Sequence, residues 1–179
     1  MFSGTLKYAI RFSVIGKYLG QLAIALAVLA LPPLVVAVMD GATAASWRYA
    51  LMLAALLGIG LSFARRPTPT PIQGNEALVI AALAFILGAF VMAFPLIGLG
   101  LPWLDAVFES ISAITTTGLS TLASVEDKPR YFLFARAWQQ WYGGLGIVVL
   151  SVALLAGYDP APRQLLDPQA RLENLDTSA

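Results

Sequence analysis

The sequence predicts an all-α integral membrane protein with four transmembrane helices, one re-entrant helix and one extended strand. Of its 179 residues, 59% are hydrophobic and 12% are charged, whereas soluble domains are about 45–50% apolar. Several uncharged stretches reach about 20 residues, enough for a helix to cross a hydrocarbon core of roughly 30 Å. A short segment rich in threonine and serine lies between two of these stretches. Function is therefore to be sought in that polar segment.

Composition excludes several classes of chemistry. Histidine and cysteine are both absent, which removes imidazole bases, thiolate nucleophiles, disulfides and most transition-metal sites. We therefore expect no cofactor in this chain. Eleven basic residues against ten acidic ones give a net charge of +1. Because no long block of basic residues occurs, we expect no nucleic-acid partner.

Four apolar stretches are the expected spans. They are Leu19–Met39, Trp47–Phe63, Ala77–Phe94 and about Arg136–Ala156. Pro32 and Pro33 lie near the far end of the first stretch, where a kink or a helix stop is easiest to accommodate. A cleaved signal peptide is the alternative for this stretch, because Ala42-Thr43-Ala44 resembles a cleavage site. The apolar run is longer than the roughly 7–15 residues of a signal peptide, so we expect it to remain as a span.

The spans divide the chain into three expected parts. Residues 1–71 contain an N-terminal cytoplasmic segment, a transmembrane hairpin and a stiff connector with alternating prolines, Pro67 to Pro71. Residues 72–157 contain a span, the re-entrant segment and a further span. Residues 158–179 are polar and are expected to form a cytoplasmic tail.

Basic residues predict the orientation in the membrane. Four spans place both termini on one side. The basic residues on that side are Lys7, Arg11, Lys17, Arg65, Arg66, Arg163 and Arg171, and those on the other are Arg48, Lys128, Arg130 and Arg136. The positive-inside rule therefore places both termini in the cytoplasm. The four tryptophans would then lie at or near the outer interface, where this residue is enriched.

The segment between the third and fourth spans has the lengths of a re-entrant loop. Pro102 suits the start of a helix and Asp105 suits its first turn. A helix from Pro102 to Ile114 would descend roughly 20 Å, which is about mid-membrane. An extended strand from Thr116 to Thr121 would recover about the same distance. The chain would thus enter and leave on the outer side.

Such a strand predicts a cation site. Its backbone groups would find no partners in lipid and so require a protein-lined, water-filled cavity, in which carbonyl oxygens can replace the water around a cation. Gly118 suits this strand because it reaches positive φ without steric cost. The C-terminal end of the preceding helix would add partial negative charge. A selectivity-filter strand is therefore the favoured interpretation.

Structural roles remain the alternative for individual polar residues. The hydroxyls of Ser110, Ser112 and Thr115 to Thr117 could bond to the preceding turn or to neighbouring helices. For Glu109, a hydrogen bond to the loop that follows the helix is favoured over a catalytic role. Glycines of the fourth span could serve only close helix packing, and Arg136 could reach the lipid headgroups.

Two motifs resemble the Trk/Ktr/HKT superfamily of potassium transporters. They are DAVFESISAITTTGLSTL, residues 105–122, and RAWQQWYGGLGIVVL, residues 136–150. Bacterial Trk-type members have a leading helix pair followed by four repeats of span, pore helix with filter strand, and span. This chain resembles the leading pair and the first pore repeat, up to about Gly157.

The resemblance implies a role for each motif residue. Filter carbonyls for potassium would come from Thr116, Thr117, Gly118 and Leu119. Thr115 would lie at the inner edge of the filter and Ser120 at its outer mouth. Support for the filter would come from Glu109, Arg136, Gly143, Gly144 and Gly146. The resemblance further implies the inner (plasma) membrane, with the filter mouth facing outward, and a cytosolic nucleotide-binding regulatory subunit as a partner.

One repeat is a quarter of a filter ring in this superfamily. The chain is therefore expected to need the remaining pore repeats or other subunits, as a fragment, as part of a split transporter or as one member of a fourfold assembly. The favoured function is potassium uptake. A non-conducting membrane scaffold is the first alternative. A membrane-embedded enzyme using Asp105 and Glu109 is the remote one, because no nucleophile motif or metal triad accompanies them.

Overall fold

A computed structural model describes residues 12–66 and 74–157 of the chain. The helices follow one another as α1 (Phe12–Met39), α2 (Thr43–Ala64), α3 (Gly74–Ala93), the 3₁₀ helix η1 (Phe94–Leu99), α4 (Trp103–Ile114) and α5 (Arg130–Gly157). No strand is present within these ranges. The all-α prediction is confirmed for the described residues. The Pro67–Pro71 connector, the polar tail and the basic residues Lys7, Arg11, Arg163 and Arg171 lie outside them.

Within residues 12–66 and 74–157, three helices are long and apolar enough to cross a membrane. They are Ser13–Met39, Thr43–Ala64 and Glu76–Ile97, and they contain the first three expected spans. The chain is thus a membrane protein. The expected fourth span lies in α5, which has 28 residues but is not one of these three helices.

The chain divides into two compact units, with the boundary between Leu145 and Gly146. The first contains α1 to α4 and the beginning of α5. The second is described only as the end of α5, residues 146–157. The packing described below belongs to the first unit.

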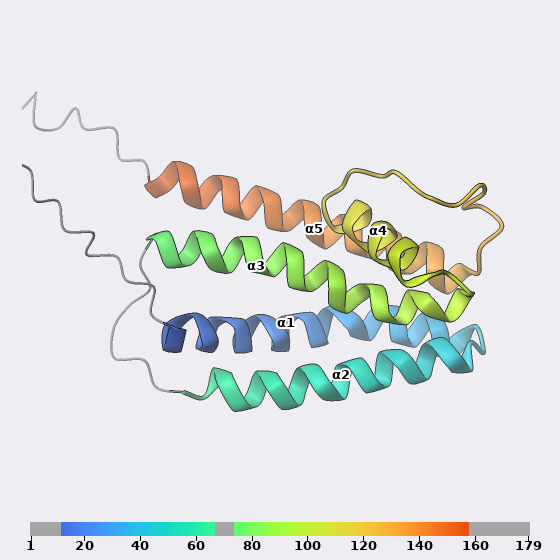
Figure 1. The fold of residues 1–179 in the computed structure, drawn as a ribbon, viewed down its shortest axis with the longest axis horizontal. Coiled ribbons are helices and arrows are strands. Elements are labelled where there is room, and N and C mark those ends of the chain that lie inside the picture. The colour runs from blue at the N-terminus through green and yellow to red at the C-terminus, as the bar shows by residue number, and fades with distance from the viewer. Residues whose placement is uncertain (1–11, 67–73, 158–179) are drawn as a thin grey trace, which may run out of the picture. The chain divides into compact units, whose positions relative to one another are not determined.

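Glycines bring α1 and α2 into close contact. Figure 1 shows the two helices side by side, with α3 next to α1. A Cβ atom on Gly20 would lie 2.6 Å from the backbone nitrogen of Ala64, and one on Gly60 would lie 2.7 Å from Cγ1 of Ile24. Neither position has room for a side chain, because real Cβ atoms do not approach other atoms this closely. The leading hairpin is therefore packed backbone against backbone, as small residues allow in membrane helices.

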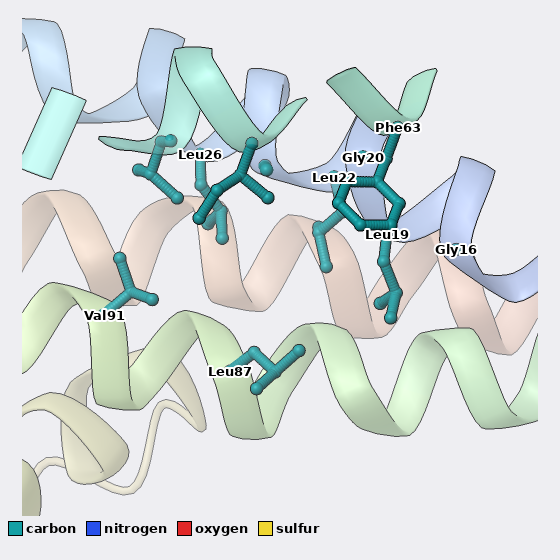
Figure 2. Close-up of a pocket in the computed structure, with 11 residues that line it drawn as sticks. Gly16, Leu19, Gly20, Leu22, Leu26, Phe63, Leu87 and Val91 are labelled. Carbon is teal, nitrogen blue, oxygen red and sulfur yellow. The ribbon is translucent and has the colours of Figure 1, made fainter. Parts of the chain in front are cut away.

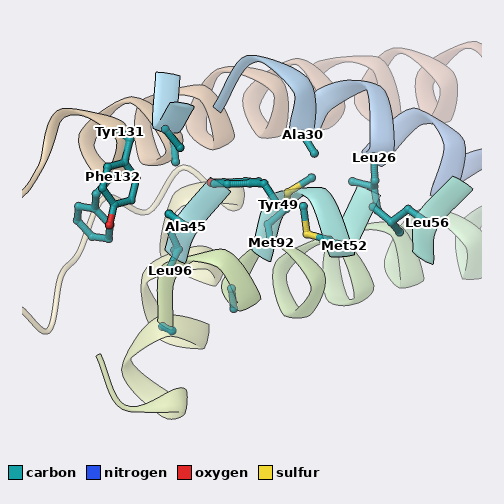
Figure 3. Close-up of a cluster of buried hydrophobic side chains, with 14 of the residues drawn as sticks. Leu26, Ala30, Ala45, Tyr49, Met52, Leu56, Met92, Leu96, Tyr131 and Phe132 are labelled. Atoms are coloured by element: carbon teal, nitrogen blue, oxygen red, sulfur yellow. The ribbon is translucent and has the colours of Figure 1, made fainter. Parts of the chain in front are cut away.

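The main core joins the hairpin to the later elements. Tyr49 and Met52 of α2, Leu96 of η1 and Phe132 of α5 are all buried in one cluster with residues of α1. Figure 3 shows these side chains distributed along the cluster, with Phe132 at one end and Tyr49 and Met52 nearer its middle. This cluster holds the start of α5 against the other helices. The same part of α5 contacts the segment after α4 through Arg136.

Prolines in α1 leave a carbonyl that α5 satisfies. Pro32 and Pro33 lie inside α1, which continues to Met39. Because Pro33 has no N–H, the carbonyl of Leu29 has no donor four residues along the helix. The indole nitrogen Nε1 of Trp138 donates to this carbonyl at 2.8 Å. The proline and the tryptophan thus form a complementary pair on two helices.

Trp138→Phe is expected to lower the free energy of unfolding by about 1–2 kcal/mol, because it leaves the Leu29 carbonyl without a donor. Unfolding in mixed micelles would measure the change. In a Pro33→Ala background the helix supplies its own amide, so the same substitution should cost clearly less. Equal costs in both backgrounds would contradict the pairing of Trp138 with the carbonyl freed by Pro33.

Candidate functional site: the segment after α4

Helix α4 ends at Ile114 as the sequence predicts, but it begins at Trp103, one residue later than expected. Pro102 is its N-cap residue, with φ −54° and ψ 151°, Asp105 lies in its first turn, and Ile114 ends it. One face of α4 is buried, including Glu109, which is fully inaccessible to solvent. The chain then continues through residues 115–121, which we call the filter segment after the role expected from the sequence.

The backbone of the filter segment is irregular. Gly118 has a φ of +79°, in the left-handed region that its lack of a side chain makes accessible. Thr116 also has a positive φ, +59°. The expected extended strand from Thr116 to Thr121 is therefore wrong at its first residue. The chain instead forms a turn at residues 115–116, directly after α4. Residues 117–120 follow without regular secondary structure.

The turn is held by the end of α4. The amide of Thr116 donates to the carbonyl of Ala113 at 2.9 Å. The amides of Thr117 and Gly118 both donate to the carbonyl of Ser112, at 2.9 and 3.2 Å. These bonds satisfy carbonyls that a helix otherwise leaves unpaired at its C-terminus. The first residues of the filter segment thus cap the C-terminus of α4, whose C-cap residue is Thr115.

The carbonyl oxygen of Leu119 accepts hydrogen bonds from within the protein. It accepts a hydrogen bond from Oγ of Ser112 at 2.6 Å and another from a terminal nitrogen of Arg136 at 3.1 Å. A carbonyl oxygen has two lone pairs, so both are engaged. In contrast, within the described residues no hydrogen bond reaches the carbonyls of Thr116, Thr117 or Gly118. These three residues are exposed.

The buried carboxylate of Glu109 holds the end of the filter segment. Its Oε1 accepts from Oγ of Ser120 at 2.7 Å and from the amide of Thr121 at 2.8 Å. Its Oε2 lies 3.0 Å from Nε of Arg136, which is also buried. These two atoms form an ion pair without the alignment of a hydrogen bond. Glu109 thus bonds to the loop after its helix, as the favoured interpretation expected.

Other hydroxyls have the structural roles that the alternative foresaw. Thr115 donates to the carbonyl of Ile111 at 2.7 Å, one turn back. Ser110 donates to Oε1 of Gln139 on α5 at 2.8 Å. Sequence reasoning did not single out Gln139, which is 2% exposed, although a glutamine within an expected membrane span is a recognisable signal.

Glycine at 143 lets α5 touch the end of α4. A Cβ atom on Gly143 would clash with the carbonyl oxygen of Ile114 and lie 2.7 Å from the carbonyl carbon. At Gly144 the nearest atom to a Cβ would be Cγ2 of Thr116, at 3.4 Å, which is an ordinary contact. Gly146 belongs to the second unit. Gly143 is therefore the position at which a side chain is excluded.

Two arginines of α5 are held in separate ion pairs. Arg130 pairs with Asp40 at 3.0 Å, whereas Arg136 pairs with Glu109. Glu109 is enclosed by its partners and has no accessible surface. In the ranges that the structure covers, no group of three or more acidic side chains could hold a metal ion. The pair of Arg136 and Glu109 thus holds the filter segment, and the pair of Arg130 and Asp40 joins two helix ends.

Comparison with known proteins decides the family. The model of the TrkH family, described as cation transport protein, matches residues 45–164. This chain belongs to the TrkH family. The match includes the filter segment and the glycines of α5.

Similar proteins support the assignment. The chain is 38% identical over 123 residues to an uncharacterised cation transporter of Methanocaldococcus jannaschii, an alignment that covers 67% of this chain and 26% of that protein. It is 32% identical over 148 residues to the Trk system potassium uptake protein TrkH of Escherichia coli, covering 80% of this chain and 31% of that one. The chain thus spans less than a third of these TrkH-family relatives, which are transport proteins and not enzymes.

Gly143→Ala should destabilise this TrkH-family chain by roughly 1–3 kcal/mol, because the new methyl group displaces the end of α4. The corresponding fall in melting temperature, roughly 2–10 °C for a chain of this size, can be measured in detergent. Gly144→Ala is the matched control, and its melting temperature should stay close to that of the parent. Equal melting temperatures for the two variants would contradict the close contact at Gly143.

Arg136→Gln should cost about 3–5 kcal/mol of unfolding free energy, because it leaves the carboxylate of Glu109 buried without its partner. The double variant Glu109→Gln, Arg136→Gln removes both charges and should recover part of that loss. Unfolding titrations of the two single variants, Glu109→Gln and Arg136→Gln, and of the double variant against the parent give the coupling energy. Additive losses would show that the two side chains do not stabilise each other.

Proposed function

We propose that this chain supplies one part of a potassium-conducting filter, and that the remaining pore repeats or other subunits supply the rest. Membership of the TrkH family and similarity to proteins named as potassium uptake proteins support this proposal. The observation that carries it is the division of the filter segment into two sides. The amides of residues 116–118 and the carbonyl of Leu119 bond to α4 or α5, whereas within the described residues no hydrogen bond reaches the carbonyls of residues 116–118.

The free carbonyls have the chemistry that a partly dehydrated cation needs. A ring of such oxygens can replace the hydration shell of potassium. The C-terminal end of α4 adds partial negative charge beside the segment. Thr116, Thr117 and Gly118 would contribute the ring oxygens, with Thr115 at its inner edge and Ser120 at its outer mouth. Leu119, whose carbonyl is already bonded twice, would instead anchor the segment.

The proposed topology has four spans, with α5 as the fourth and α4 as the re-entrant pore helix. Both termini would be cytoplasmic in the inner (plasma) membrane, with the filter mouth outward. Lys17, Arg65 and Arg66 on one side of the expected spans support this orientation. Residues 72–157 would be the pore repeat between a leading part, 1–71, and a tail, 158–179. A cytosolic nucleotide-binding regulatory subunit is proposed from the resemblance alone.

Gly118→Ser in a complete transporter that carries this chain should lower potassium selectivity over sodium by about tenfold or more, because a side chain resists the left-handed backbone that turns the carbonyls inward. Rubidium uptake by potassium-starved cells, with sodium as competitor, measures this selectivity. Gly100→Ser is the matched control, since Gly100 has a similar φ of +75° in a turn before α4. Its selectivity should be unchanged.

Unchanged selectivity of Gly118→Ser at normal protein levels would overturn the filter assignment.

A second measurement tests ion flux through this chain without other pore repeats or subunits. In liposomes we expect no rubidium flux through a single copy, because one segment cannot surround a cation. Flux accompanied by a fourfold assembly would instead show that copies of this chain complete the ring.

A further inference from the structure

A groove without polar lining runs along α1 and includes no residue of α4 or of the filter segment. It has a volume of about 290 Å³ and lies between α1, α2 and α3. Figure 2 shows Leu19, Leu22 and Leu26 of α1, Phe63 of α2, and Leu87 and Val91 of α3 around it. Gly16 and Gly20 of α1 also line the groove. Its lining offers no group that could bind water or a polar ligand.

Positive charge lies at one end of this groove. The guanidinium of Arg66 stacks on the ring of Phe63, with 4.3 Å between its central carbon and the ring centroid. Phe63 is itself part of the groove wall. Arg65 is the next residue but one after Phe63, and both arginines are exposed. Within the described residues neither forms an ion pair, so two cationic groups are available where the groove meets the helix end.

We propose that this groove binds one anionic phospholipid, with an acyl chain between α1, α2 and α3 and the phosphate at Arg65 and Arg66. The three helices are those long and apolar enough to cross a membrane, so hydrocarbon chains surround the groove. An acyl chain fills an irregular apolar groove with dispersion contacts that an empty one would lack. Basic residues at a helix end attract anionic headgroups. Because Arg66 stacks on Phe63 of the groove wall, the headgroup site lies next to the acyl-chain site.

The site is independent of the filter segment, because it shares no residue with α4 or with residues 115–121. It requires only that α1 to α3 lie in a membrane. A test therefore needs no ion flux. Purified full-length chain is titrated with phosphatidylglycerol or phosphatidylcholine of identical acyl chains, and bound lipid is counted by native mass spectrometry. We expect one lipid to be retained, with phosphatidylglycerol preferred by about tenfold.

The charge variant is Arg65→Gln, Arg66→Gln. It should remove most of the preference for phosphatidylglycerol, since each basic residue near anionic lipid contributes about fivefold in affinity. Its matched control is Lys128→Gln, Arg130→Gln, which removes two charges at the opposite end of the α1–α2 hairpin, where Arg130 pairs with Asp40. This control should keep the preference. An equal loss in both variants would overturn the headgroup assignment.

The groove variant is Gly16→Leu, which places a side chain in the space for the acyl chain. A Cβ atom at Gly16 meets only Phe63, at 3.6 Å, so the helix can accept it. Retention of both lipids should fall about tenfold. Gly58→Leu on α2 is the matched control, because nothing lies within 4 Å of its Cβ and it does not line the groove. Equal lipid retention by the two variants, or a changed oligomer mass with Gly16→Leu alone, would overturn the proposal in favour of a protein occupant.

Discussion

The buried ion pair between Glu109 and Arg136 is the interaction on which the filter segment depends. It joins α4 to α5, and each partner also holds the segment: Glu109 through Ser120 and Thr121, and Arg136 through the carbonyl of Leu119. Charges buried without partners are strongly unfavourable in a membrane protein. The pair therefore fixes the two helices and the segment in a single arrangement, because moving any one of them would separate the charges or break their hydrogen bonds.

The local features of this site could be predicted from the sequence. Pro102 and Asp105 mark the start of α4, and the left-handed backbone at Gly118 follows from the glycine itself. The first three apolar helices follow from hydropathy alone, although α1 begins earlier than its apolar stretch because a lysine can lie within a helix near the membrane surface. Likewise α5 starts at Arg130 and not near Arg136, since charge limits a membrane span but does not end a helix.

Features set by tertiary contacts could not be predicted in this way. The sequence does not show which side of the filter segment faces α5, and that side determines whether a carbonyl is free or bonded. Leu119 has the same backbone chemistry as its neighbours, yet Ser112 and Arg136 occupy its oxygen. The role of Gln139 depends in the same way on Ser110, 29 residues earlier. Only the packing of two helices brings such residues together.

The double role of Ser112 has a consequence for how such a protein assembles. Its carbonyl holds the amides of Thr117 and Gly118, and its hydroxyl holds the carbonyl of Leu119 seven residues along the chain. One residue thus closes a short loop by contacts of low sequence separation, which form quickly and at small entropic cost. Together with the ion pair between Glu109 and Arg136, these contacts shape the loop from α4 and α5 of this chain alone. A pore of this family can therefore be assembled from parts that are already shaped when they meet.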